Sequence, residues 1–403
     1  MLHDYPNSIL TPRGRPAGAS VDSWTESDHA LMRTAAGLAW SGAGRTGTNP
    51  IVGSVVSRDG RIIATGFHGE KGIAHAEVVA LDAAGEAARG ATLYASLEPC
   101  AHHGRTPPCT DRIIAAGVAR VVIPALDPDE RVNGRGVALL RAAGIQVDIG
   151  CEAGSAILDN LGYYHDRLGL PSLVTIKMAL SGDGMVARAP GRRDTVTGEA
   201  ARTQVHALRA LHDAVLVGIE TLLADAPRLD CRLLNPAPDR IPVPVVLDSH
   251  LRTPAENAWS RAGRPFIVVT VPGPAADRVR AIEARGGRVF TCTPSTHGPD
   301  VGAAVAALAA AGLRRILVEG GPRVVASLVA TGCWDAAWYY RAPVVFGPGG
   351  VPATPAAAPG DVVDRVRVGD DERVRSIGAR PLAEIAARVR MAAGNGGPEC
   401  LPD

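Results

Sequence analysis

The sequence predicts two consecutive α/β domains, and three observations support this fold class. The chain has 403 residues, more than a single domain of ordinary size holds. Short apolar runs typical of buried strands alternate with segments whose apolar residues recur at helical spacing. The alternation stops near Gly169-Leu170-Pro171 and starts again at Ser172. Strands that alternate with helices indicate layered α/β domains.

Composition favours a small-molecule enzyme over a nucleic-acid binder or a membrane protein. The formal charge is +1, from 42 basic and 41 acidic residues, and aromatic residues make up 4% of the chain. Binding to a phosphate backbone needs a concentrated positive face, and stacking on bases needs aromatic side chains. No window approaches the run of about 18 apolar residues that spans a bilayer. The seven cysteines follow no repeating frame, which predicts a reducing cytoplasm.

Local signals divide the chain into four parts. Residues 1–27 contain scattered prolines, glycines and charges, and we expect a partly disordered extension. Residues 28–170 form the first predicted domain, and residues 171–392 form the second. Residues 393–403 are expected to be a mobile tail.

The first domain is expected to begin with a helical face that starts near Asp28. An Asp59-Gly60 pair predicts a hairpin turn between two strands. Gly117 is the expected stop of a helix that opens at Cys109. The other expected elements are strands at 49–56, 62–66, 92–97, 121–124 and 145–147, and helices at 75–84, 136–143 and 157–168.

In the second domain, Thr197 is the expected N-cap of a helix that runs through Leu211. Glycines at 320 and 321 follow a strand and precede a helix, an arrangement whose backbone N–H groups can hold a phosphate. No GxGxxG motif of the Rossmann type is present. The expected strands are 173–179, 214–218, 244–248, 265–270, 315–319 and one near Val366, and the other helices are 303–311, 324–329 and 381–392.

Metal ligands and a carboxylate gather in one stretch of the first domain. His75, Cys100 and Cys109 supply three zinc ligands, and a catalytic zinc keeps its fourth position for water. Glu77 follows the histidine by two residues and is the expected proton carrier. Zinc lowers the pKa of water and so provides a nucleophile for an amino-substituted ring carbon. A chance His-x-Glu or a structural zinc is the competing interpretation, but a structural site needs a fourth ligand.

The run Leu97-Glu98-Pro99-Cys100 through Cys109, with His-His-Gly-Arg-Thr-Pro-Pro between the two cysteines, resembles the deaminase half of the bifunctional riboflavin-biosynthesis deaminase/reductase. The short zinc-deaminase signature has two residues between its cysteines, whereas this chain has eight. The resemblance implies a three-layer α/β/α domain of the cytidine-deaminase type. It also implies that Asn49 hydrogen-bonds the pyrimidine, although Asn before Pro is also a common turn pair.

The second domain resembles the reductase half of the same family at residues 177–184, around Thr197, at 207–209, 221–232, 248–249 and 319–322. The resemblance implies a dihydrofolate-reductase-like α/β fold that uses NADPH to reduce a ribosyl group to ribityl. It places Arg209, Leu229, Arg232 and Glu319 toward the substrate. It places six residues toward the cofactor: Ala179, Thr197, Thr221, Asp225, Ser249 and Gly321.

Four positions depart from the pattern of the reductase half. Thr195 replaces a tryptophan, Gly182 replaces a leucine, Arg193 aligns with a serine, and Ala226 replaces an aspartate. The reductase is therefore expected either to be active or to be a degenerate domain used for substrate capture or assembly.

The sequence as a whole predicts a zinc-dependent pyrimidine deaminase followed by an NADPH-dependent reductase. The resemblance implies that the substrate is 2,5-diamino-6-(5-phosphoribosylamino)pyrimidin-4(3H)-one. A deaminase acting alone, or on a related pyrimidine, is the alternative. Members of the family commonly pair through their reductase domains, so a homo-oligomer is also expected.

Overall fold

The computed structural model describes residues 24–70, 73–103, 107–192, 194–234, 236–378 and 385. The predicted tail, most of the predicted extension and helix 381–392, and Arg193 lie outside these residues. The chain divides into two compact units: within the described residues, the first contains those up to Leu170 together with Ile385, and the second contains residues 171–378. None of the helices in the described ranges is long and apolar enough to cross a bilayer.

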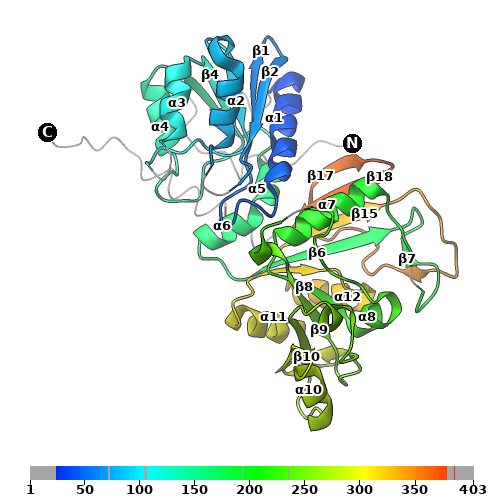
Figure 1. Ribbon diagram of the computed structural model, residues 1–403. Coiled ribbons are helices and arrows are strands. Elements are labelled where there is room, and N and C mark those ends of the chain that lie inside the picture. Colours follow the sequence, from blue (N-terminus) through cyan, green and yellow to red (C-terminus); the bar gives the residue numbers. More distant parts are fainter. Residues whose placement is uncertain are drawn as a thin grey trace. The chain divides into compact units, whose positions relative to one another are not determined.

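Within the described residues, the first unit is built on a five-stranded sheet (Figure 1). Its strand order is β2-β1-β3-β4-β5. Strand β1 is antiparallel to β2 and β3, whereas β3, β4 and β5 are parallel. Asp59 and Gly60 both have positive φ in the β1–β2 hairpin, as the predicted turn requires. The strands are β1 (Gly53–Arg58), β2 (Arg61–Phe67), β3 (Thr92–Ala95), β4 (Arg120–Ile123) and β5 (Gln146–Ile149).

Helices cover both faces of this sheet and make the predicted three layers. Gly53 packs against α1, and Gly66, opposite Ser54 in the neighbouring strand, packs against α2. Adjacent strand residues point to opposite faces, so α1 and α2 lie on opposite sides. Helices α3 and α4 share a hydrophobic core with α2. The helices are α1 (Glu26–Ala39), α2 (Ala76–Ala84), α3 (Cys109–Ala116), α4 (Arg135–Ala142), α5 (Ala153–Asp159) and α6 (Leu161–Arg167).

The second unit contains a nine-stranded sheet within the described residues, in the order β11-β10-β9-β8-β14-β6-β15-β18-β17. Neighbouring strands of this sheet are parallel, except that β18 is antiparallel to both β15 and β17. The strands are β6 (Leu173–Leu180), β8 (Ala214–Gly218), β9 (Val243–Leu247), β10 (Phe266–Thr270), β11 (Gly287–Thr291), β14 (Arg315–Val318), β15 (Ala336–Arg341), β17 (Asp361–Val368) and β18 (Asp371–Ile377).

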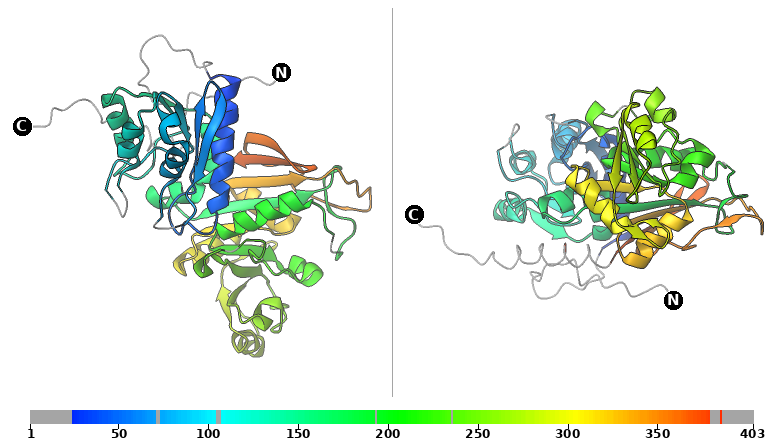
Figure 2. Two further views of the ribbon diagram at one scale, coloured as in Figure 1. Left: turned by 45° about the horizontal axis from the view of Figure 1, so that its top comes forward. Right: turned by 90° about the horizontal axis from the view of Figure 1, so that it is seen from below.

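Alternate residues of β6 define the two faces of this sheet. Val174, Ile176 and Met178 join the core that includes residues of α11 and α12. On the other face, Thr175 bonds to His212 at the end of α7, which lies along β6 in Figures 1 and 2. The helices are α7 (Glu199–Ala210), α8 (Ile219–Asp225), α9 (Ala258–Arg261), α10 (Ala276–Glu283), α11 (Val301–Ala310) and α12 (Pro322–Thr331).

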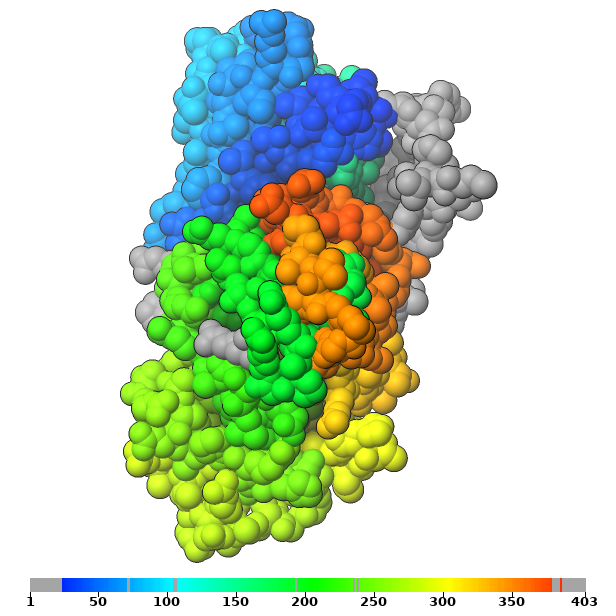
Figure 3. All heavy atoms as spheres, turned by 90° about the vertical axis from the view of Figure 1, so that its right-hand side faces the viewer, coloured from blue at the N-terminus to red at the C-terminus, as the bar shows by residue number. Residues whose placement is uncertain are grey.

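A small antiparallel pair lies outside the large sheet. Strands β7 (Met185–Ala187) and β16 (Val351–Pro352) pair with each other, and their green and orange segments lie side by side in the space-filling view (Figure 3). A second pair, β12 (Pro294–Ser295) with β13 (Gly298–Pro299), is equally short. The sequence did not predict these pairs because two or three residues carry no detectable periodicity.

Two local predictions were wrong. The helix expected over 157–168 is divided at Asn160, whose side chain bonds to a distant segment, into α5 and α6. The N-cap of α7 is Gly198 and not Thr197. The N–H of Gly198 donates to Asp371 Oδ2 at 2.8 Å. Asp371 belongs to β18, so this hydrogen bond attaches the start of α7 to a strand of the large sheet.

Candidate active sites

Three elements bring the predicted zinc ligands together in the first unit. His75 is the N-cap of α2, Cys109 is the first residue of α3, and Cys100 lies in the loop that follows β3. His75 Nδ1 lies 3.2 Å from Cys109 Sγ and 3.5 Å from Cys100 Sγ. The backbone N–H of Cys109 points at Cys100 Sγ, 3.2 Å away. The three side chains therefore converge on one point, with Nδ1 as the histidine atom that faces it.

This donor set fits zinc. The three ligand atoms lie within 4.8 Å of one another. Bonds of about 2.0–2.3 Å to a tetrahedral zinc imply ligand separations of roughly 3.5–3.8 Å. One nitrogen and two sulfurs at such distances leave a fourth position, as a catalytic zinc requires.

Glu77 lies beside the triad and is almost completely buried. Burial, reinforced by the neighbouring Cys100 thiolate, raises the pKa of Glu77 to about 7. The hydrogen bond from Cys109 lowers the pKa of Cys100 to about 4, and the same bond with burial raises the pKa of Cys109. A divalent cation removes this competition because both sulfurs bind it as thiolates. A carboxyl that titrates near neutrality suits a group that must accept and return a proton.

A pocket of about 320 Å³ opens onto the triad. Predicted residue Asn49 lines it, as do His68 and His102, whose Nε2 and Nδ1 atoms are buried without a described hydrogen-bond partner. The His68 and His75 rings pack edge to face, with the ring centroids 5.3 Å apart. The other lining residues include Glu98, Asp127, Asp129, Arg131, Val132, Tyr163 and Arg167.

Two buried side chains that the sequence did not single out shape this pocket. Asn160 bonds the backbone N–H and C=O of Ile51, each at 2.9 Å, and so fixes the segment that follows Asn49. The Glu98 carboxylate accepts the backbone N–H groups of Asp127, Gly134 and Val137. Each contact joins segments at least 29 residues apart, so no local motif could have identified it.

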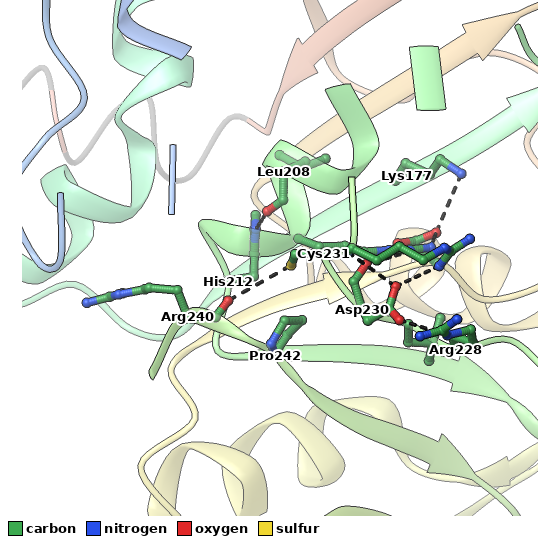
Figure 4. Close-up of polar contacts among 12 residues, drawn as sticks. Lys177, Leu208, His212, Arg228, Asp230, Cys231, Arg240 and Pro242 are labelled. Atoms are coloured by element: carbon green, nitrogen blue, oxygen red, sulfur yellow. Dashed lines mark hydrogen bonds and ion pairs between the residues drawn. The ribbon is translucent and has the colours of Figure 1, made fainter. Parts of the chain in front are cut away.

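In the second unit, Glu319 forms ion pairs with two cations, Arg209 from α7 and Lys177 from β6, the latter labelled in Figure 4. Arg209 donates to both carboxylate oxygens, from Nε at 2.6 Å and from Nη2 at 3.0 Å. Lys177 Nζ, from β6, lies 3.5 Å from Glu319 Oε2. Burial by itself raises the pKa of Glu319. The positive charge of Arg209, and then that of Lys177, outweighs this effect and lowers the pKa to about 2. Lys177 was not among the predicted site residues.

The remaining predicted substrate residues lie in the segment after α8. Asp230 pairs with Arg232 at 2.6 Å and with Arg228 at 2.9 Å, and Arg209 donates to its carbonyl at 3.1 Å (Figure 4). Arg232 is therefore connected to Arg209 through Asp230. Leu229 has a buried side chain and a positive φ of 45°, so it shapes this turn through its backbone.

The predicted cofactor residues include two that lie close to each other, Thr221 and Gly321. Thr221, in α8 after β8, lies close to Gly321, the N-cap of α12 after β14, because a Cβ on Gly321 would be 3.4 Å from Thr221 Oγ1. Strands β8 and β14 are adjacent, and the chain leaves them toward opposite edges of the sheet, from β8 to β9 and from β14 to β15. Such a switch point, with a helix N-terminus beside it, suits the pyrophosphate of a dinucleotide. These residues therefore fit NADPH.

The other four cofactor predictions are distributed around the same sheet. Ala179 lies near the end of β6, and Thr197 is buried just before α7. Asp225 ends α8, and Ser249 follows β9. Ala179 and Ser249 thus lie at the carboxyl ends of parallel strands, where nucleotides bind in open α/β sheets.

Three of the departures from the reductase pattern lie in described segments. Ala226 is the C-cap of α8 with a φ of 43°, a conformation that asparagine or aspartate adopts more readily than alanine. Gly182 donates its N–H to Val344 O at 2.7 Å, and a Cβ there would meet carbonyl oxygens at ordinary contact distances. Thr195 is exposed. None of the three belongs to the ion-paired group of Glu319, Arg209 and Lys177.

Fold and sites together define a zinc-dependent deaminase joined to a nucleotide-dependent reductase. Residues 25–125 match the cytidine and deoxycytidylate deaminase zinc-binding region, and residues 172–365 match the RibD C-terminal domain. Riboflavin biosynthesis protein RibD of Bacillus amyloliquefaciens is 40% identical over 321 residues, which cover 78% of this chain and 84% of the relative. The Escherichia coli (strain K12) protein of that name is 37% identical over 336 residues, covering 79% and 89%.

Solved structures agree with this assignment. Acinetobacter baumannii RibD (form 1) has a TM-score of 0.59 and 32% identity, and covers 87% of this chain and 99% of its own. The deaminase/reductase of Thermotoga maritima has a TM-score of 0.60 and 31% identity, with 88% and 99% covered. The chain belongs to the RibD family of bifunctional riboflavin-biosynthesis enzymes. The predicted fold class, the two activities and the use of zinc and NADPH are thereby confirmed.

Proposed function

We propose that this chain catalyses two consecutive steps of riboflavin synthesis on one phosphoribosylated pyrimidine. The first replaces the 2-amino group of 2,5-diamino-6-(5-phosphoribosylamino)pyrimidin-4(3H)-one with oxygen and releases ammonia. The second uses NADPH to reduce the ribosyl group of the product to ribityl. The observation that carries the proposal is the convergence of His75, Cys100 and Cys109 beside the buried carboxyl of Glu77.

For the deamination, His75, Cys100 and Cys109 would hold zinc, which when bound supplies Lewis-acid activation of a water molecule. Glu77 accepts a proton from the attacking water and delivers protons to the ring nitrogen and the departing amine. One carboxyl thus acts first as base and then as acid. Asn49, held through the Asn160–Ile51 hydrogen bonds, is the proposed partner of the pyrimidine ring.

For the reduction, Arg209 and Arg232 are the proposed contacts of the substrate phosphate, which suits the fork of a guanidinium. Glu319 keeps Arg209 in position through its two hydrogen bonds. NADPH supplies the hydride, and reduction of the open sugar also requires a proton. Lys177, whose pKa is lowered by burial, is the proposed proton donor.

The proposal includes a cytoplasmic setting and pairing of two chains through the reductase unit. All six cysteines within the described residues are free thiols, which supports a reducing compartment. Sedimentation equilibrium of the purified chain tests the pairing.

The decisive experiment follows ammonia release and NADPH oxidation separately after the diaminopyrimidine substrate is added to zinc-loaded protein. We expect ammonia first and NADPH consumption second. If NADPH is not consumed even when the deaminated product is supplied directly, the second activity is contradicted. If no ammonia is released, the deaminase substrate is wrong.

A further inference from the structure

Asp129 holds two arginines at the wall of the deaminase pocket. Arg131 donates to both of its carboxylate oxygens, from Nε at 2.9 Å and from Nη2 at 2.6 Å. Arg167, from α6, approaches the same carboxylate with Nε at 3.4 Å. All three residues line the pocket that contains the zinc ligands. Asp129 is buried, whereas the side chain of Arg131 is 59% exposed and that of Arg167 is 36% exposed.

Aromatic and carboxylate contacts orient this group further. The Arg167 guanidinium lies 5.2 Å from the centre of the Tyr163 ring, a cation–π distance. Tyr163 donates its hydroxyl to Asp127 Oδ1 at 2.9 Å, and the N–H of Asp129 donates to the same oxygen at 2.8 Å. The arginines are thus fixed by side chains that are themselves hydrogen-bonded, which reduces the entropy lost when a ligand binds.

The charges around the pocket show what kind of ligand needs these arginines. Among the described lining residues, Glu77, Glu98, Asp127 and Asp129 are acidic, whereas Arg131 and Arg167 are the permanent cations. A phosphate monoester carries about −1.5 to −2 charges near neutral pH, so these carboxylates would repel it. Guanidinium groups bind such an anion through paired hydrogen bonds.

We propose that Arg131 and Arg167, positioned by Asp129, bind the phosphate of the deaminase substrate. This inference rests on the proposed function and adds the part of the first site that recognises the phosphoribosyl arm. It makes the deaminase selective for a phosphorylated pyrimidine over the corresponding unphosphorylated ribosylamino compound. The phosphate contacts of the reductase lie on other arginines, so each unit would hold the phosphate independently.

The test compares ammonia release from the phosphorylated substrate and from its dephosphorylated form in Arg131→Gln and Arg167→Gln variants. A charge-assisted hydrogen bond contributes about 1.5–3 kcal/mol, so each variant should raise KM for the phosphorylated substrate roughly ten- to a hundredfold. The kcat for that substrate and the kcat/KM for the dephosphorylated compound should change little. Lysine at either position should restore part of the affinity.

Arg135→Gln is the matched control, because Arg135 is an exposed arginine at the start of α4 that does not line the pocket. It should leave both substrates unaffected. Equal losses for the two substrates in the Arg131 and Arg167 variants would show that these arginines only support the fold. An unchanged KM for the phosphorylated substrate would equally overturn the proposal.

Failure of the proposed function would have a different signature. In that case the wild-type protein would release no ammonia from either compound. Calorimetric titration with ribose 5-phosphate, in an Arg232→Gln background that weakens the reductase site, then measures phosphate binding without catalysis. Binding that disappears when Arg131→Gln and Arg167→Gln are added supports the inference, and unchanged binding contradicts it.

Discussion

At the scale of single residues, Glu77 combines nearly complete burial with a position two residues from a zinc ligand. Glu77→Gln keeps the shape of the side chain and removes its ability to carry a proton. We expect ammonia release to fall by about 10²–10⁴-fold, the usual contribution of a general acid–base group. The zinc content, measured by atomic emission after dialysis, should stay at the wild-type level.

Asp82→Asn is the control for this change because it also converts a carboxylate to an amide in α2. Its side chain is 61% exposed and pairs with Arg112 at 2.8 Å. Exposed ion pairs contribute little to stability, so activity should remain near that of the wild type. Loss of zinc from Glu77→Gln would contradict the assignment and indicate that Glu77 is a ligand.

The two sites differed in how much the sequence could predict. His75 and Glu77 belong to one short motif, and each cysteine follows a proline, so local chemistry was sufficient to propose the triad. Asn160 and Arg167 were missed because their partners lie 109 and 38 residues away and become neighbours only in the folded domain. Lys177 was missed because it resembles an ordinary lysine in an apolar strand.

At the scale of elements, α7 is joined to β6 by a buried histidine. His212 Nδ1–H donates to Leu208 O at 2.7 Å, and Nε2 lies 2.9 Å from the Thr175 hydroxyl oxygen. Burial lowers the pKa of His212 to about 4. The unfolded chain takes up this proton near pH 6.5, so lowering the pH from 6.5 to 4 favours unfolding by about 3 kcal/mol through this residue.

Urea unfolding at pH 7 and pH 4.5 measures this effect. In His212→Asn the difference in unfolding free energy between the two pH values should be smaller than in the wild type, although the variant is less stable at pH 7. His250→Asn, at an exposed histidine of the same unit, should keep the wild-type difference. An identical pH dependence in all three proteins would contradict a neutral buried His212.

Close backbone packing places the helix that carries the first site. A Cβ on Gly66 would lie 2.4 Å from the carbonyl oxygen of Ala76 and 2.6 Å from the nitrogen of Ala80. Gly66→Ala should therefore displace α2, cost about 1–3 kcal/mol and lower the zinc content along with ammonia release. Gly37, in α1, has no neighbour within 4 Å of such a Cβ, so Gly37→Ala should stabilise the protein by about 0.5–1 kcal/mol. Full zinc occupancy in Gly66→Ala would show that α2 tolerates the shift.

At the scale of the whole molecule, the sequence predicted the alternation of strands and helices but not the order of strands in the sheets. Apolar runs such as 214–218 can be recognised as strands from the sequence, because buried parallel strands are apolar on both faces. Strand β18 contains Arg373 and Arg375, which pack on Trp338. Because charged residues take these packed positions, the segment lacks the apolar pattern that predicts a strand. Its place beside β15 depends on pairing with a strand 30 or more residues earlier in the chain.

The two units have separate hydrophobic cores, and all three zinc ligands belong to the first. Removal of zinc with a chelator should abolish ammonia release and lower the melting temperature of the first unit, since a ligand that binds only the native state stabilises it. The second unit has its own cation cluster around Glu319 and does not contribute a ligand. NADPH oxidation with the deaminated product supplied directly should therefore continue at the wild-type rate, and added zinc should restore ammonia release. Loss of both activities on chelation would mean that the reductase depends on the metal-bound state of the deaminase.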